Sequence, residues 1–565
     1  MAESLSGLLQ DLCRMKRLSI LFMLCGWLLS LQAQNTFILG GELSNSAATC
    51  VADIDEVMPR MKALGLNTVL VPAYWEFLEP TEGQFDFTLI DRTIDKAREN
   101  DLKVIFLWFG AWKNSMSCYA PLWFKENAKR FPRAMTQNGK PLEIASCFSD
   151  NVLQADLKAF SSLMQHLADK DKGTGTVIMM QIENEIGMLE DARDHSPLAE
   201  KAYQQPVSQA LLKHLGIKQK GTWAEVFGTD VYADEKFMAY HYALYVEHLA
   251  KAAREIYDMP LYVNAAMNSR GRKPGEYPSA GPLAHLVDFW QAGAPSIDLL
   301  APDIYDTGFK GWASQYAMPL RPQDGGKVKN RLFIPESRCC ENSGVRALYA
   351  FGEHQALGFS PFAIDQASLR ETESITKAYG LLRELQAYTT KQAPLTSYGL
   401  LFDQSDKERI ILDGDNALTC RHYFTLPWDP RATDDSTWPE GGAILLKLAK
   451  NEYLLAGSGV VVEFKKKTEK EQEEQRVLGE DGFVLPLGDG SFLAKKIQPK
   501  KNRPQMAKMF RGKRLGIGFV DEVSIDPQGQ LTYLRRHNGD QDHQGRHARI
   551  SVGDWKILHI KLYEY

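Results

Sequence analysis

Between residues 34 and 388, short apolar runs alternate with longer amphipathic stretches. Apolar residues recur at helical spacing from Ile54 to Leu64 and again from Phe87 to Ala97, as expected for helices with one buried face. The apolar runs between such stretches have the length of buried strands and cover residues 37–39, 68–72, 104–109, 177–182, 261–264, 298–301, 332–334 and 358–362. This alternation predicts a (β/α)8 barrel. A doubly wound sheet is the alternative, but no GxGxxG or P-loop motif follows an early strand.

The pattern changes after about residue 389, where short segments of alternating polarity replace the helical periodicity. The turn pairs Asp413-Gly414, Asp489-Gly490 and Asn538-Gly539 separate several of these segments. Such turns between runs of period two are typical of antiparallel hairpins. The segments cover residues 409–412, 443–446, 459–464, 516–520 and 556–562. Residues 389–565 are therefore predicted to form an antiparallel β-sandwich.

The N-terminus has the pattern of an export signal. An apolar run at residues 18–31 follows Lys16 and Arg17, and the small residue Ala33 comes shortly after it. This order is typical of a secretory signal peptide, whereas a membrane span needs about 18 apolar residues or more. We expect cleavage near Ala33, no stable membrane span afterwards, and export to the periplasm or outside the cell. Because Met15 directly precedes the basic pair, residues 1–14 are interpreted as an over-extended start.

Charge and cysteine content narrow the classes of partner and cofactor. The chain has 66 Lys and Arg against 71 Asp and Glu, so it lacks the basic excess that nucleic-acid binding requires. Removal of residues 1–33 leaves six cysteines, too few for a disulfide scaffold, and we expect mostly buried free thiols. The disulfide status of Cys118, Cys147, Cys339 and Cys340 stays open. No CxxC or HExxH motif is present, so we expect neither metal nor organic cofactor.

Carboxylates follow two of the predicted strands. The run 177–182 leads into Glu183-Asn184-Glu185, and the run 332–334 leads into Pro335-Glu336. In an extended segment Glu183 and Glu185 would share one face, unless a bulge intervenes. Active sites of barrels lie at these strand ends, and a buried carboxylate is costly unless it has a task. Two facing carboxylates suit retaining glycoside hydrolysis, with one as acid/base and the other as nucleophile. The alternative is that they pair with Lys or Arg at the rim.

These residues resemble the retaining (β/α)8 glycosidases, and in particular the family 35 β-galactosidases. Residues 181–187 (QIENEIG) are similar to that family's QxENEYG signature, with Ile186 in place of the usual Tyr. Residues 67–87 are similar to its second-strand block (NTV, W, EP, G, FDF), and the resemblance extends over about residues 36–365. It implies that Glu185 is the acid/base, Glu336 the nucleophile and Asn184 a contact to the sugar 2-hydroxyl, with Glu183 in a supporting position.

The sequence departs from the family at two other strands. Residues 106–114 (FLWFGAWKN) share little with the RPGPYICAEW-like block that grips galactose in family 35. Residues 40–45 (GGELSN) match the family's GEIHY only at the Gly-Glu step. The chain thus resembles a divergent bacterial branch with its own C-terminal β-domain, and the sugar specificity stays open.

Further candidate substrate contacts stand at or near the predicted strand ends. Tyr305 matches the place where this clan often puts a tyrosine that hydrogen-bonds the nucleophile. A carboxylate at Glu42 could accept sugar hydroxyls, and tryptophan faces suit stacking on sugar C–H groups. The aromatic candidates have core packing as their alternative. The full set is Glu42, Tyr74, Trp75, Trp108, Trp112, Asn114 and Tyr305.

The combined hypothesis is a secreted retaining exo-β-glycosidase, of β-galactosidase type, that acts on terminal β-linked sugars of oligosaccharides or polysaccharides. Other exo-specificities are the first alternative: β-glucosidase, β-xylosidase or α-L-arabinopyranosidase. A non-catalytic glycan-binding protein that kept the barrel is the second. Whether the chain forms a homo-oligomer, and whether its C-terminal domain binds glycan, stay open.

Overall fold

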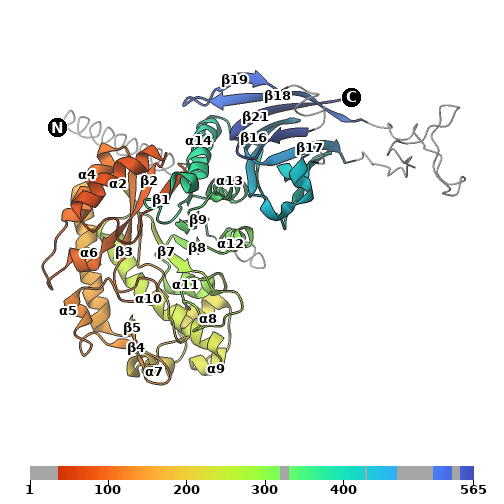
Figure 1. Cartoon of the computed structure of the whole chain (residues 1–565). Helices are drawn as coiled ribbons and strands as arrows, with labels where there is room; N and C mark the ends of the chain where they lie inside the picture. Colours follow the sequence, from red (N-terminus) through yellow and green to blue (C-terminus); the bar gives the residue numbers. More distant parts are fainter. Residues whose placement is uncertain (1–35, 318–329, 427–428, 468–512, 538–546) are drawn as a thin grey trace, which may run out of the picture. The chain divides into compact units, whose positions relative to one another are not determined.

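The computed structural model describes residues 36–317, 330–426, 429–467, 513–537 and 547–565 (Figure 1). The chain divides into two compact units, one reaching to Ala393 and including Ile525–Gln530, the other comprising Pro394–Ser524 and Leu531–Tyr565. The expected signal peptide at residues 1–33 lies outside the described residues. So do the predicted turn pairs Asp489-Gly490 and Asn538-Gly539.

The first unit is a barrel of parallel strands, which confirms the predicted (β/α)8 fold. Strands β9 and β10 form one strand interrupted at Pro335, and because β9 pairs with β11 while β10 pairs with β8, the sheet closes on itself. Proline has no N–H to offer the ladder, which explains the interruption. The strands are β1 (Ile38–Glu42), β2 (Thr68–Tyr74), β3 (Lys103–Phe109), β6 (Val177–Gln181), β7 (Leu261–Ala266), β8 (Leu299–Ile304), β9 (Phe333–Ile334), β10 (Glu336–Ser337) and β11 (Gly358–Phe359).

Amphipathic helices surround these strands (Figure 1). The predicted periodicity is confirmed in α2 (Val51–Ala63), whose buried residues are Ile54, Val57, Met58 and Met61. The other long helices are α4 (Thr88–Glu99), α6 (Asp150–Asp171), α10 (Val231–Ile256), α13 (Ser343–His354) and α14 (Leu369–Lys391). The connections after β3 and β6 are long and carry short elements: α5 (Leu122–Lys125), the hairpin β4 (Arg133–Met135) and β5 (Pro141–Ala145), α7 (Pro197–Tyr203), α8 (Gln209–Leu215) and α9 (Trp223–Phe227). Short helices α3 (Trp75–Leu78), α11 (Val287–Gly293) and α12 (Phe309–Tyr316) complete the layer.

The second unit is an antiparallel sandwich, as predicted. One sheet has the order β12-β15-β16-β21-β18-β19 and the other β13-β14-β17-β20, and apolar residues of both sheets form one buried cluster. The predicted turn at Asp413-Gly414 joins β13 to β14, and Gly414 has the positive φ of 57° that such a turn needs. The strands are β12 (Thr396–Phe402), β13 (Glu408–Asp413), β14 (Asn416–His422), β15 (Gly441–Ala449), β16 (Glu452–Ser458), β17 (Val460–Lys466), β18 (Leu515–Ile525), β19 (Leu531–Arg536), β20 (His547–Ile550) and β21 (Lys556–Glu564).

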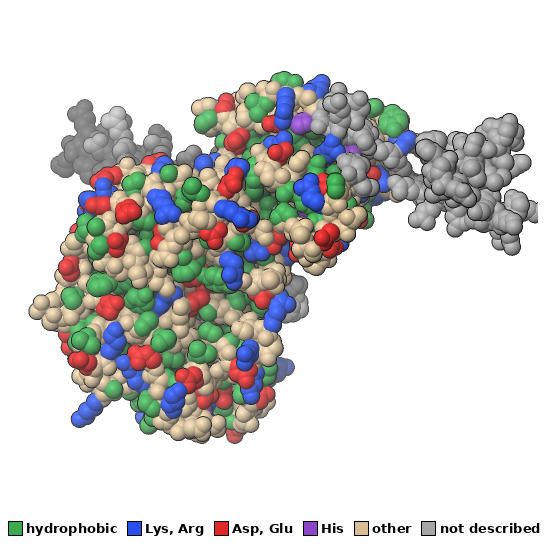
Figure 2. All heavy atoms as spheres, in the orientation of Figure 1, with side chains coloured by type: hydrophobic (Ala, Val, Ile, Leu, Met, Phe, Trp, Pro, Cys, Tyr) green, Lys and Arg blue, Asp and Glu red, His purple; other side chains and the backbone are tan. Residues whose placement is uncertain are grey.

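Three further expectations can be compared with the described residues. No helix among them is long and apolar enough to cross a bilayer. Their six cysteines are free thiols as expected; Cys420 is buried, Cys50 is exposed and the other four are half-buried, so the expectation of mostly buried thiols is met only in part. Lys and Arg side chains are interspersed with Asp and Glu on the face drawn in Figure 2. The absence of a nucleic-acid partner stays a prediction.

Tyr379 gives a test of how the helix layer is fastened to the barrel. Its fully buried hydroxyl on α14 donates to the carbonyls of Gly40 (2.7 Å) and Phe359 (2.6 Å), on β1 and β11. We predict that Tyr379→Phe lowers the free energy of unfolding by about 1–3 kcal/mol, because two buried carbonyls lose their donor. Chemical denaturation followed by tryptophan fluorescence measures this. The control is Tyr232→Phe, at a side chain that is 52% exposed. Equal free energies of unfolding for Tyr379→Phe and Tyr232→Phe would contradict the inference that the Tyr379 hydroxyl fastens α14 to the barrel.

Candidate active site

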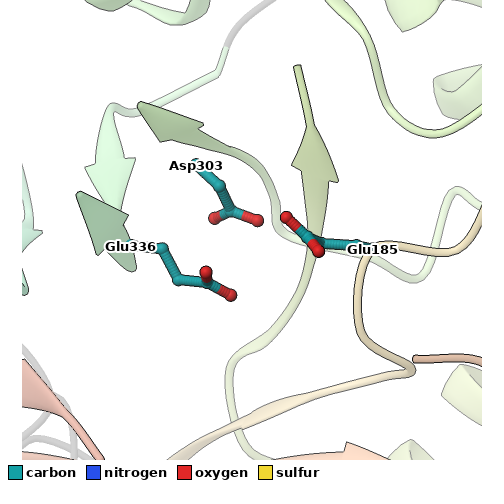
Figure 3. Close-up of side chains that lie close together, drawn as sticks. All are labelled: Glu185, Asp303 and Glu336. Atoms are coloured by element: carbon teal, nitrogen blue, oxygen red, sulfur yellow. The ribbon is translucent and has the colours of Figure 1, made fainter. Parts of the chain in front are cut away.

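Three carboxyl groups meet at the carboxyl ends of the barrel strands (Figure 3). Glu185 lies just beyond β6, Asp303 near the end of β8, and Glu336 opens β10. One oxygen from each group lies within 4.8 Å of the other two. All three residues are buried, with exposed fractions of 9%, 1% and 3%. The structure thus brings Glu185 and Glu336 together as the sequence predicts, and it adds Asp303.

Glu336 lies among hydrogen-bond donors. Asn184 and Asn264 each place Nδ2 3.3 Å from its Oε1, and the Tyr305 hydroxyl donates to its Oε2 over 2.8 Å. Asn264 also accepts the Glu185 N–H through Oδ1 (2.9 Å), so one amide connects both glutamates. Three donors around one carboxylate stabilise negative charge at this position. Of the sequence-based candidates, Asn184 and Tyr305 therefore contact Glu336 directly.

Glu185 has the protonation behaviour of a general acid. Burial, followed by the negative charge of Glu336, raises its pKa to about 7, while the Lys113 ammonium and a hydrogen bond from Asp303 act in the opposite direction. A carboxyl group with a pKa near neutrality can both give and take a proton at working pH. The two glutamates therefore differ in surroundings in the way that an acid/base and a nucleophile require.

The backbone around Glu185 is in a rare conformation. Glu183 and Glu185 have positive φ angles of 56° and 46°, and so do Asn114 (51°) and Ser115 (56°) in the loop opposite. The two segments are hydrogen-bonded, since Asn114 N–H donates to the Asn184 carbonyl and Ser115 N–H to the Glu185 carbonyl, each over 3.2 Å. Non-glycine residues held with positive φ cost free energy and cluster at functional sites. This conformation separates Glu183 from Glu185, so the shared face expected of an extended segment is wrong.

Glu183 instead pairs with Asp156 of α6. Both side chains are fully buried and hydrogen-bonded to each other. Asp156 also accepts from the Trp108 indole (2.8 Å) and the Tyr245 hydroxyl (2.7 Å), and Glu183 accepts from the Trp112 N–H (2.7 Å). Burial raises the pKa of both carboxyl groups, and in Glu183 the charge of Asp156 adds to the increase. A carboxyl–carboxyl hydrogen bond needs a proton, so the pair carries one.

The remaining polar candidates lie close to this cluster. Glu42 ends β1, is fully buried, and neither of its carboxyl oxygens accepts from a nitrogen or hydroxyl among the described residues. Burial, and then the charge of Glu336, raises its pKa well above the ordinary value. Asn114 accepts a hydrogen bond from the Lys113 ammonium (2.8 Å). Lys113 itself is only 3% exposed and was not predicted.

The proposed stacking role of the tryptophans is wrong. Trp75 and Trp108 are fully buried, and their indole N–H groups donate to Glu79 (2.9 Å) and Asp156 (2.8 Å). Trp108 packs on Phe160 of the helix layer, and Trp112 packs edge-on against Tyr242 and Tyr245 of α10. Their rings fill the space between strands and helices and have no face for a sugar.

Tyr74 also belongs to the core and not to a sugar platform. Its ring is 3% exposed and packs edge-on against Phe77 and Phe109. A sugar contact at Tyr74 is therefore not supported.

Asn264 and Asp303 belong to the site but were not predicted, although polar residues at the carboxyl ends of barrel strands are site candidates. Asn264 closes the predicted run 261–264, and Asp303 stands two residues beyond the run 298–301. Both are polar residues at the carboxyl end of a barrel strand. Asp156 and Lys113 carry no such signal, because one lies on a helix and the other in a long loop.

Among the described residues, the carboxyl groups of Glu185, Asp303 and Glu336 lie close enough together to hold a cation. Carboxylate oxygens are the ligands that Mg²⁺ and Ca²⁺ take in proteins. The expected absence of metal and cofactor stays a prediction.

Comparison with known proteins places part of the chain near the glycosidases. Residues 49–234 match glycoside hydrolase family 42, described as beta-galactosidase, and residues 375–549 match a domain of unknown function. No curated protein matches the sequence. The family 42 match supports a glycoside hydrolase related to β-galactosidases, with a carbohydrate substrate. The narrower resemblance to family 35 stays a prediction.

Solved structures of three β-galactosidases are similar to part of the chain. That of the haloarchaeon Halorubrum lacusprofundi shares 17% identity over 63% of this chain and 58% of its own, with a TM-score of 0.43. The structure from Marinomonas ef1 shares 14% identity over 62% of this chain and 60% of its own, with a TM-score of 0.42. That of Rahnella sp. R3 shares 16% over 62% and 56%, with a TM-score of 0.43. The chain thus spans less than two-thirds of each of these proteins.

The Glu183–Asp156 pair gives a prediction about stability. Glu183→Gln keeps a donor for Asp156 and should change the free energy of unfolding by about 1 kcal/mol or less, whereas Glu183→Ala should cost about 3–5 kcal/mol. The raised pKa values mean that the folded state binds more protons than the unfolded state. Wild-type stability should therefore fall as pH rises above the ordinary glutamate range, and less steeply in Glu183→Gln.

Urea denaturation at a series of pH values measures both effects. Identical pH dependence in the wild type and in Glu183→Gln would show that the pair holds no additional proton.

Proposed function

We propose that this protein is an exported retaining exo-β-glycosidase of β-galactosidase type, which removes terminal β-linked sugars from glycans by double displacement. The observation that carries the proposal is the pair Glu185 and Glu336, which lie in a buried site with one oxygen of each carboxyl group within 4.8 Å of one oxygen of the other. Inverting glycosidases separate their two carboxyl groups by about 6.5–9.5 Å to admit a water molecule. The shorter separation here favours retention.

The surroundings of the two glutamates suit the two steps of that mechanism. In the first, Glu185 protonates the glycosidic oxygen while Glu336, with donors from Asn184, Asn264 and Tyr305, attacks the anomeric carbon. In the second, Glu185 takes a proton from the water that hydrolyses the glycosyl ester, and the sugar leaves with its original configuration. The pKa of Glu185, about 7, suits both donation and acceptance.

Unpaired acceptors indicate how the sugar would be held. Asn184 Oδ1 is buried and has no partner among the described residues, and neither carboxyl oxygen of Glu42 accepts from a nitrogen or hydroxyl there, although the Glu42 carboxyl is hydrogen-bonded to that of Glu336. Buried acceptors without donors are costly, and sugar hydroxyls are donors of the right kind. We assign the 2-hydroxyl contact to Asn184 and another hydroxyl to Glu42.

The finer parts of the proposal rest on the sequence. Specificity for galactose is suggested by the match of residues 49–234 to a beta-galactosidase family. Export rests on the apolar run at 18–31 with its basic flank. A panel of aryl glycosides tests specificity, and we expect faster turnover of the β-galactoside than of the β-glucoside, β-xyloside or α-L-arabinopyranoside.

Replacement of the nucleophile tests the chemistry. Glu336→Gln should lower kcat for 4-nitrophenyl β-galactoside by at least about 10³-fold, because the amide cannot form the glycosyl ester. The control is Glu341→Gln, at an exposed residue that pairs with Arg370, and it should keep wild-type activity. Proton NMR of the wild-type reaction should show the β-anomer first. Wild-type rates in Glu336→Gln, or an initial α-anomer, would refute the mechanism.

The pH profile tests the role of Glu185. Since the acid must carry its proton, kcat/KM should fall tenfold per pH unit above about 7, which is the raised pKa of Glu185. Glu185→Gln should abolish this alkaline limb and slow substrates with poor leaving groups far more than dinitrophenyl substrates. A profile for the wild type that stays flat far into the alkaline range would assign the acid to another group.

A further inference from the structure

Asp303 is the third carboxyl group of the cluster and has no role in the two-step mechanism. Figure 3 shows its side chain directed into the space between Glu185 and Glu336. It is 1% exposed, and its hydrogen bond to Glu185 joins the two carboxyl groups directly. A buried titratable group in contact with the acid/base needs an explanation of its own.

Asp303 has fewer donors around its carboxyl group than Glu336 has. The main electrostatic influences on Asp303 come from the carboxyl groups of Glu336, Glu185 and Glu42, and its Oδ1 has no nitrogen or hydroxyl partner among the described residues. The amide of Asn264 donates to Oδ2 of Asp303 over 2.7 Å. Glu336, by contrast, receives hydrogen bonds from three donors. An uncompensated buried carboxylate is costly and becomes neutral by binding a proton.

Asp303 and Glu185 share a hydrogen bond that needs one proton. The charged groups around them favour this proton on Asp303 and not on Glu185. Lys113 interacts with Glu185 and Glu42, which favours charge on Glu185. Burial, and then the charges of Glu336, Glu185 and Glu42, raises the pKa of Asp303 well above its ordinary value. The titratable groups that face Asp303 are the carboxyls of Glu42, Glu185 and Glu336 and the phenols of Tyr262, Tyr305 and Tyr316.

We propose that Asp303 is a positioning residue that stays a neutral carboxylic acid and donates a hydrogen bond to Glu185 whenever Glu185 is ionised, as it is after it has given its proton to the glycosidic oxygen. The donated bond fixes the Glu185 side chain next to Glu336. It also stabilises the ionised form of Glu185, and its proton stays on Asp303 throughout. The catalytic role of the hydrogen bond from Asp303 to Glu185 rests on the proposed function. A retaining glycosidase needs Glu185 as a base when the glycosyl ester is hydrolysed.

The protonation state can be tested without any substrate. At about pH 8 an ordinary aspartate is ionised, so the infrared spectrum of the wild type in D₂O should contain a protonated-carboxyl C=O band that Asp303→Asn removes. Asp306→Asn, three residues away and paired with Arg270, is the matched control and should leave the spectrum unchanged. Identical spectra for the wild type and Asp303→Asn would overturn the inference, whether or not the protein hydrolyses a galactoside.

The effect on Glu185 is tested by kinetics with two variants. Asp303→Asn keeps a neutral donor, so the alkaline limb of kcat/KM should stay within a few tenths of a pH unit of the wild type. Asp303→Ala loses the donor, so the limb should move up by about one pH unit and kcat for a dinitrophenyl galactoside should fall about tenfold or more. A downward shift in Asp303→Asn would mean that Asp303 is ionised, and an unmoved limb in Asp303→Ala would mean that it does not act on Glu185. Either result overturns the inference. Failure of the wild type to hydrolyse any aryl glycoside would count against the proposed function and leave the infrared result standing.

Discussion

The arrangement of the candidate active site depends on one electrostatic constraint: four carboxyl groups are buried close together, and Lys113 is the cation among the described residues that acts on two of them. The four groups are those of Glu42, Glu185, Asp303 and Glu336, at the barrel mouth. Such groups cannot all be ionised at neutral pH. Asn184, Asn264 and Tyr305 place donors at Glu336, whereas burial raises the pKa values of Glu42, Glu185 and Asp303. The proposed division between nucleophile and acid rests on this difference in surroundings.

The backbone maintains this arrangement at a cost in strain. Glu183 and Glu185 both have positive φ angles, and their side chains point in different directions. Glu183 points toward α6 and Glu185 points toward the site. Hydrogen bonds from Asn114 and Ser115 hold the segment, and the Glu183–Asp156 pair anchors it behind. Strain of this kind persists only where the surrounding contacts determine the conformation.

Much of this could be predicted from the sequence, and the failures have physical reasons. Apolar periodicity located the barrel strands, and polar residues at their ends identified Glu185 and Glu336. The pattern does not say toward which side an aromatic ring points, so Trp75 and Trp108 were misassigned to the sugar although they pack against the helix layer. Lys113 comes from a long loop and Asp156 from a helix, and only the folded chain brings Lys113 to the site and Asp156 to Glu183.

The central claim is that Glu336 attacks the sugar and forms a covalent bond with it. Incubation with a 2-deoxy-2-fluoro-β-galactosyl fluoride, followed by peptide mass spectrometry, tests this most directly because the fluorine slows the second step and traps the ester. We predict time-dependent inactivation and one fluorosugar on the peptide that contains Glu336, with no label in Glu336→Gln. A label on another carboxylate, or turnover with no covalent species and an inverted product, would contradict the account.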